Sequence, residues 1–103
     1  MPDALSIDIL TTDDRTVVRV VGEVDLATQD MIGAALAAEG IEPRALTVDL
    51  AGVTFLDSAG LRMLVLLHRR CADNGGALVV RGAPPAVQTL FQITGLDSIL
   101  TIS

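Results

Sequence analysis

The pair Asp57-Ser58 is the clearest candidate for chemistry at a hydroxyl group in this sequence. It lies in the segment VTFLDSAGL, residues 53–61, between a strand-like stretch and a helix-like one. In open α/β sheets, ligands and partners meet the carboxyl ends of strands. A helix start also offers free backbone N–H groups and a partial positive charge. From the residues alone, Ser58 is either a functional hydroxyl group or a helix N-cap that contributes about 1 kcal/mol.

Ser58 lacks the base that a nucleophilic serine requires within hydrogen-bonding reach. The only histidine is His68, ten residues further along the same predicted helix. An α-helix rises 1.5 Å per residue, so the two residues should lie about 15 Å apart. We therefore predict no catalytic residue, and we interpret His68 as the end of an apolar helix stripe.

Three carboxylates, Asp25, Asp49 and Asp57, could gather near one strand end, where paired carboxylates can perform acid–base chemistry. The chain has 13 acidic residues, which favours solvated or capping roles for these three. There is no GxSxG elbow, GxGxxG loop or Cys/His metal spacing, and all seven basic residues are Arg. Because the chain has no lysine, it cannot have a P-loop lysine or form a lysine Schiff base. We expect no enzyme activity, no cofactor and no metal.

The composition favours a protein partner over nucleic acid or lipid. The chain has 103 residues, half of them hydrophobic, which suffices for one domain and its core. A formal charge of −6 repels phosphate backbones and anionic lipids, and only two aromatic residues are present for base stacking. Cys71 is single, residues 1–4 do not resemble a signal peptide, and the longest apolar run, residues 63–67, is too short to span a membrane. We expect a cytoplasmic protein.

Alternation and β-branched runs predict five strands. Leu5, Ile7 and Ile9 alternate with polar residues, and a turn at 13–14 leads to a second strand at 16–21 that ends at Gly22. The third strand is expected at 46–50, with a loop opening at Ala51-Gly52. The fourth is expected at 77–80 and the last at 99–102.

Three helices are predicted between these strands. Asp25 or Thr28 could cap the first, which Gly40 ends; the second runs from Ser58 to Asp73; the third starts at Pro84-Pro85 and closes at Gly95. The second helix should be largely buried. The expected inner faces of the three helices consist, respectively, of Ile32, Ala35, Leu36 and Glu39; of Leu61, Leu64, Val65 and His68, with Met63, Leu66, Leu67 and Arg70 beside them; and of Val87, Leu90, Phe91 and Thr94.

The predicted order is β-β-α-β-α-β-α-β. An N-terminal hairpin followed by αβ alternation implies one α/β domain over residues 1–103, with a mixed sheet whose later strands are parallel.

This order, the turn Gly22-Glu23-Val24-Asp25 and the segment 53–61 resemble the STAS domain. In particular, the chain is similar to the anti-sigma factor antagonists of bacterial sporulation and stress regulation. The resemblance covers essentially the whole chain. The second motif is fairly specific, and the first is weak alone.

The resemblance implies partner switching. The unphosphorylated protein would bind an anti-sigma factor that is also a serine kinase and thereby release the sigma factor. The kinase would phosphorylate Ser58 with ATP, binding would be lost, and a PP2C-type phosphatase would reset the cycle. The implied partner-binding residues are Asp25, Thr28, Asp57, Ser58, Ala59, Gly60 and Arg62.

Two positions depart from the family pattern. Ala59 stands where members often have Ser or Thr, and Arg62 stands where a small residue is common. Arg62 could pair with an acid of the kinase or with the phosphate, or it could simply face solvent. A second interpretation also stays open, because stand-alone STAS domains serve in phospholipid-transport or signalling complexes, where the partner is a membrane-associated protein.

Overall fold

A five-stranded mixed sheet in the order β1-β2-β3-β4-β5 organises the chain in the computed structural model, which describes residues 5–103. β1 (Leu5–Thr11) and β2 (Thr16–Val24) form the antiparallel hairpin, while β3 (Ala45–Leu56), β4 (Ala77–Arg81) and β5 (Thr101–Ile102) continue in parallel. The predicted fold class and element order are confirmed. Residues 1–4, where we looked for a signal peptide, lie outside the described part.

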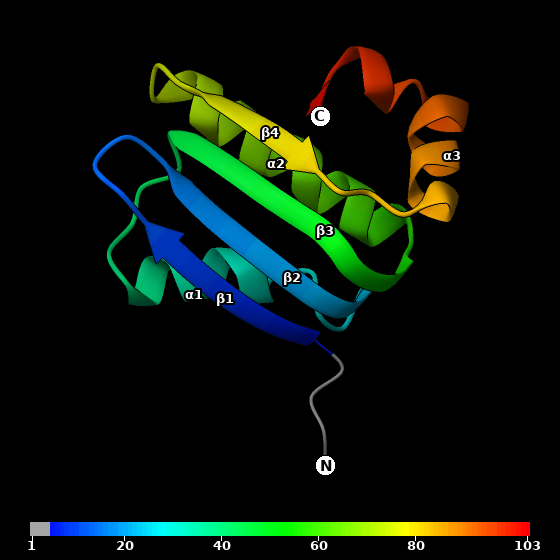
Figure 1. Ribbon diagram of the computed structural model, residues 1–103, viewed down its shortest axis with the longest axis horizontal. Helices are drawn as coiled ribbons and strands as arrows, with labels where there is room; N and C mark the ends of the chain where they lie inside the picture. Colours follow the sequence, from blue (N-terminus) through cyan, green and yellow to red (C-terminus); the bar gives the residue numbers. More distant parts are fainter. Residues whose placement is uncertain (1–4) are drawn as a thin grey trace.

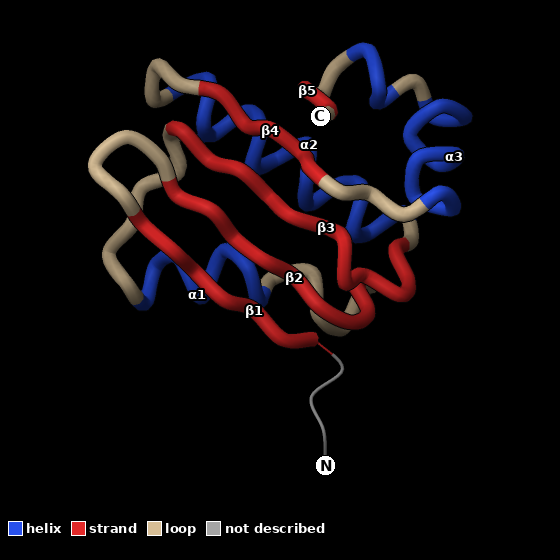
Figure 2. Tube along the Cα trace, in the orientation of Figure 1, coloured by secondary structure: helices blue, strands red, loops and turns tan. Residues whose placement is uncertain are grey.

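Helices α1 (Met31–Ala38) and α2 (Ser58–Asp73) cover one face of the sheet, as Figures 1 and 2 show, and α3 (Pro85–Thr94) lies to one side. The opposite face faces the viewer in Figure 1 and carries no helix. The core lies between the sheet and the helices and is made almost entirely of aliphatic side chains, among them Val18, Val48, Leu64 and Leu78, with Phe91 as its one large ring.

β2 and β3 are longer than the sequence suggested. β2 does not end at Gly22 but continues to Val24, and β3 does not give way to a loop at Ala51-Gly52 but continues to Leu56. Two register shifts accommodate the extra length, because β3 has one residue more than β2 at each of them. Such bulges bend a strand without ending its pairing. Gly52 is required at the first shift, since a Cβ atom there would lie 2.8 Å from Cγ2 of Val21.

Helix α2 matches its predicted bounds, but the helix faces are narrower than predicted. Leu61 and Leu64 are buried, whereas Leu66 is 46% exposed and Arg70 is exposed, so α2 is amphipathic and not largely buried. Glu39 and Thr94, predicted on the inner faces of the first and third helices, are also exposed, because Glu39 is the C-cap of α1 and Thr94 is the last residue of α3.

The last predicted strand, residues 99–102, is shortened to the two residues of β5, and a short 3₁₀ helix, Leu96–Ser98, precedes it. Gly95 makes this turn possible by closing α3 with a left-handed backbone at φ 76°. Within residues 5–103, no helix is both long enough and apolar enough to cross a membrane.

Candidate functional site

Asp57, not Ser58, caps helix α2. Its backbone is extended, and its Oδ1 accepts hydrogen bonds from the amides of Ala59 at 2.9 Å and Gly60 at 3.2 Å. Ser58 is the first helical residue and is exposed, and its hydroxyl makes no hydrogen bond with residues 5–103. The predicted N-cap role therefore belongs to the neighbouring carboxylate, whose side chain reaches the second and third helical amides. This arrangement leaves the serine hydroxyl available.

Asp25 and Thr28 close a turn ahead of α1 and do not cap that helix, contrary to the prediction. Oδ1 of Asp25 accepts from the amides of Ala27 at 3.0 Å and Thr28 at 3.1 Å. The buried Thr28 hydroxyl donates to the carbonyl of Glu23 at 2.7 Å and accepts from the amide of Asp25 at 3.0 Å. The N-cap of α1 is Asp30, whose side chain makes no capping bond. The turn fixes the Asp25 loop to the end of β2.

The Asp25 loop, residues 25–30, and the Ser58 loop, by which we mean the junction 57–58 between β3 and α2, lie side by side at the carboxyl ends of β2 and β3. Val24 pairs with Leu56, and the amide of Asp57 donates to the carbonyl of Val24 at 3.3 Å. Gly60 allows this close approach, because a Cβ atom there would lie 3.0 Å from the carbonyl oxygen of Val24 and 2.9 Å from Cγ of Leu56. The two motifs, about 30 residues apart in sequence, therefore form one surface.

Asp49 does not join the carboxylates at that end. It lies in the middle of β3, where Oδ1 accepts from the amide of Ala51 at 2.9 Å and Oδ2 pairs with Arg81 at 3.3 Å. The hydrogen bond from Ala51 is the main reason that the pKa of Asp49 is lowered; burial opposes it, and Arg81 adds to the lowering. The possible gathering of three carboxylates is thus wrong for Asp49, because β3 extends seven residues beyond it.

Of the remaining predicted site residues, Ala59 is partly exposed, Gly60 is buried and Arg62 is exposed. Arg62 follows Ser58 by four residues, so both lie on the same side of α2. Two apolar side chains at this end were not predicted as site residues: Leu26 is 75% exposed and Phe55 is 49% exposed. Leu26 follows Asp25, and Phe55 comes two residues before Asp57, so the sequence could have marked both as contact residues. Exposed apolar side chains beside a functional loop often mark a contact surface.

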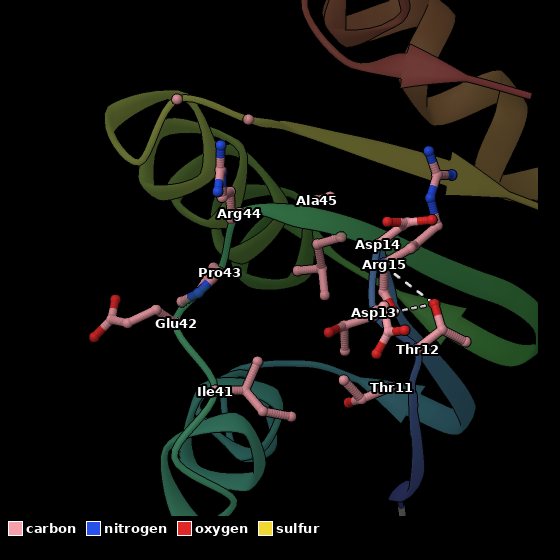
Figure 3. A pocket seen from close by; sticks show the side chains of 14 residues that line it. Thr11, Thr12, Asp13, Asp14, Arg15, Ile41, Glu42, Pro43, Arg44 and Ala45 are labelled. Atoms are coloured by element: carbon pink, nitrogen blue, oxygen red, sulfur yellow. Dashed lines mark hydrogen bonds between the residues drawn. The ribbon is translucent and has the colours of Figure 1, made fainter.

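A further hollow lies at the other end of the strands and involves none of these residues. It measures about 550 Å³ and is formed by the β1–β2 turn, the α1–β3 connection and the glycines before β4. Figure 3 shows Asp13, Arg15, Glu42 and Arg44 around it. Its charges are mixed, and Thr12 is bonded to Arg15 within the turn. In the part of the chain that the structure describes, no group of three His, Cys, Asp or Glu side chains could hold a metal ion.

Comparison with known proteins agrees with this geometry. The family model described as "Mlab, STAS domain" matches residues 7–101. The anti-sigma-B factor antagonist of Listeria monocytogenes is 33% identical over 100 residues, which is 95% of this chain and 88% of that protein. An anti-sigma factor antagonist from Mycobacterium paratuberculosis is 32% identical, with a TM-score of 0.79 over 99% of this chain and 87% of its own.

A more distant structure shares the fold alone. The Bacillus cell fate determinant SpoIIAA in its phosphorylated form is 18% identical, with a TM-score of 0.64 over 95% of this chain and 91% of its own.

Proposed function

Because this chain belongs to the STAS domain family, we propose that it is an anti-sigma factor antagonist controlled by phosphorylation of Ser58. The observation that carries the proposal is the free, exposed hydroxyl of Ser58 at the start of α2, beside the Asp57 cap. Two relatives named for this activity share about a third of their residues with the chain. A cytoplasmic location follows from this role.

The docking surface for the anti-sigma factor comprises the Asp25 loop, Ser58 and Arg62. Leu26 and Phe55 supply exposed apolar area at the same end, and apolar anchors of this kind dominate the energy of many interfaces. Thr28 and Gly60 are buried, so they support the surface by holding its two loops together. Arg62 adds a cation, which can pair with an acidic group of the partner.

A hollow of about 280 Å³ between α1 and α2 extends this surface. It is lined by Gln29 and Asp30, which follow the Asp25 turn, and by Met63 and Leu66 from α2. Leu66 is 46% exposed. We include this groove in the docking surface because Gln29 and Asp30, which line it, directly follow the Asp25 turn.

In the modification step, the Ser58 hydroxyl oxygen attacks the γ-phosphorus of ATP held by the kinase. The Oγ–P bond forms, the bond to the bridging oxygen breaks, ADP leaves, and the hydroxyl proton passes to a base of the kinase. This chain contributes only the acceptor, since the only histidine, His68, lies half-buried well along α2. A PP2C-type phosphatase would restore the hydroxyl.

The added phosphate abolishes binding through charge. It contributes about −1.5 to −2 charges at neutral pH. The adjacent Asp57 carboxylate repels it, and the exposed helix start offsets only about 0.3–1 kcal/mol. In free protein, water screens the new charge, but at an interface it must be desolvated. A penalty of about 3 kcal/mol lowers affinity more than 10²-fold, while the fold is retained.

The test is incubation with ATP and the cognate anti-sigma factor serine kinase, followed by mass spectrometry of peptides. We expect one phosphate on Ser58 in the wild type and in Ser6→Ala, whose serine lies on exposed β1, and none in Ser58→Ala. In a matching pull-down, Ser58→Ala should retain the kinase and Ser58→Asp should lose it. No phosphate on the wild type, or equal labelling of Ser58→Ala, contradicts the proposed site.

The alternative role in a phospholipid-transport or signalling complex shares this fold, and the name of the matching family model does not separate the two roles. It predicts co-purification with a membrane-associated protein, and the Ser58→Asp substitution should not change the amount that co-purifies. The same pull-down therefore distinguishes the two functions.

A further inference from the structure

A row of alternating charges crosses the face of the sheet that carries no helix. The strand register places Asp8 opposite Arg19, Arg19 opposite Asp49, and Asp49 opposite Arg81. Residues directly opposite one another on adjacent strands point to the same face. The order across β1, β2, β3 and β4 is therefore negative, positive, negative, positive. The row is neutral, although the whole chain carries −6.

A second row on the same face is largely apolar. Two residues along each strand from the charged row, Leu10, Val17, Thr47 and Val79 are in register. Leu10 is 68% exposed. Asp8, Leu10, Arg19 and Arg81 line a hollow of about 360 Å³ on this face. The face is thus partly apolar, and the charges of its first row are balanced. Arg15 adds a cation beside the second row, where its guanidinium donates to the Thr47 hydroxyl at 2.9 Å.

We propose that this open face binds a second copy of the chain, face to face, about a two-fold axis parallel to the strands. Rotation about an axis between β2 and β3 reverses the order of the strands without reversing their direction. Asp8 then faces Arg81 of the second copy, and Arg19 faces Asp49 of the second copy. The same rotation brings Leu10 onto Val79 of the second copy. Isologous interfaces require this kind of self-complementarity.

The expected dimer is weak. Strands about 4.8 Å apart and residues about 3.3 Å apart give four strands by five residues a flat area of roughly 300 Å². Stable complexes bury about 800 Å² on each partner. Arg81 and Asp49 already bond one another within each chain, so the outer pair of Asp8 and Arg81 and the inner pair of Arg19 and Asp49 each add only part of a new ion pair. We expect a dissociation constant on the order of 0.1 mM, in the transient class of interfaces.

The dimer is independent of the proposed regulatory function. Because the axis is parallel to the strands, both copies present their Ser58 loops at the same end of the assembly. The helices that carry the docking surface lie on the outer sides, so both Ser58 hydroxyl groups stay accessible (Figure 1).

Sedimentation equilibrium of unphosphorylated protein from about 10 µM to 1 mM, a range that brackets the expected weak affinity, tests this inference. The wild type should show a reversible monomer–dimer equilibrium. Asp8→Arg places two cations opposite each other, and Arg81→Glu places two anions opposite each other, so each variant alone should dimerise at least tenfold more weakly. An equimolar mixture of the two should form the heterodimer, in which both outer pairs attract. A wild type that stays monomeric, or a mixture no more associated than its components, overturns the inference.

A second pair of variants is independent of the Asp49–Arg81 ion pair. Leu10→Asp should weaken the dimer at least tenfold, whereas Ile93→Asp, which introduces the same charge at an equally exposed residue of α3, should not. Circular dichroism melting establishes that each variant is folded. Equal dimerisation of Leu10→Asp and Ile93→Asp would place the interface elsewhere and contradict the proposal.

Discussion

The carboxylate of Asp57 lies 2.9 Å from the amide of Ala59, and this contact separates two roles that the sequence had left to one residue. A helix start requires an acceptor for its free amides, and Asp57 supplies it. Ser58 is therefore not needed to form the helix. Its hydroxyl can be modified without removing a bond that holds α2 in place.

Removing the Asp57 cap should destabilise the fold, whereas removing the Ser58 hydroxyl, the proposed phosphate acceptor, should not. We expect Asp57→Ala to lower the free energy of unfolding by about 0.5–2 kcal/mol. Ser58→Ala should change it by less than about 0.5 kcal/mol, as is usual for exposed positions. Urea denaturation of the two variants provides the comparison. Equal losses would mean that Ser58 takes part in capping.

The hydrogen bonds of the Thr28 hydroxyl should contribute more to the free energy of unfolding than the packing of the Thr28 methyl group. Thr28→Val keeps the shape but leaves the carbonyl of Glu23 and the amide of Asp25 without their partner, so we expect a loss of about 1–3 kcal/mol. Thr28→Ser retains the hydroxyl and should cost about 1 kcal/mol or less for the missing methyl group. If the turn supports the docking surface, Thr28→Val also weakens binding of the anti-sigma factor more than Thr28→Ser does, as calorimetry would reveal.

Two glycines in helices should respond to alanine with opposite signs. Gly60→Ala places a methyl group against Val24 and Leu56, and overpacking of this kind costs about 1–3 kcal/mol. Gly33→Ala meets nothing within 4 Å in α1 and should stabilise the protein by about 0.5–1 kcal/mol. Thermal melting of both variants measures the difference. A stabilised Gly60→Ala would show that the Asp25 and Ser58 loops are not held at close approach.

Asp49 should make stability dependent on acid pH. The folded state holds the pKa of this carboxyl group below its ordinary value of 3.8, so its contribution is complete above about pH 4 and is lost as pH falls through the lowered pKa. Asp49→Asn should therefore be less stable than the wild type at neutral pH, and the difference should shrink below about pH 4. Urea denaturation at several pH values measures it, with Asp13→Asn, from an exposed turn, as the baseline. A gap between wild type and Asp49→Asn that is constant with pH would contradict the assignment.

Local patterns were sufficient for most of the fold. Helix α2 has the predicted bounds, because its apolar positions, its polar start and Asn74-Gly75-Gly76 at its end all lie within one stretch of sequence. The order of elements along the chain and the closing turn at Gly95 were equally local in origin. The exposed ends of the helices were harder to predict from the sequence, because periodicity does not reveal where a helix loses contact with the core.

By itself, the amino-acid sequence determined the mixed α/β sheet, the Asp57-Ser58 helix start and the separation of His68 from Ser58 along one helix. Only the tertiary structure decided that β2 and β3 continue through Gly22 and Gly52, because pairing between neighbouring strands outweighs the weak strand preference of glycine. It also decided that Asp57 is the cap, that Asp25 lies beside Ser58, and that Asp49 joins a row of charges on the open face. These outcomes depend on strand register, which joins residues far apart in the chain and has no signal in any single segment.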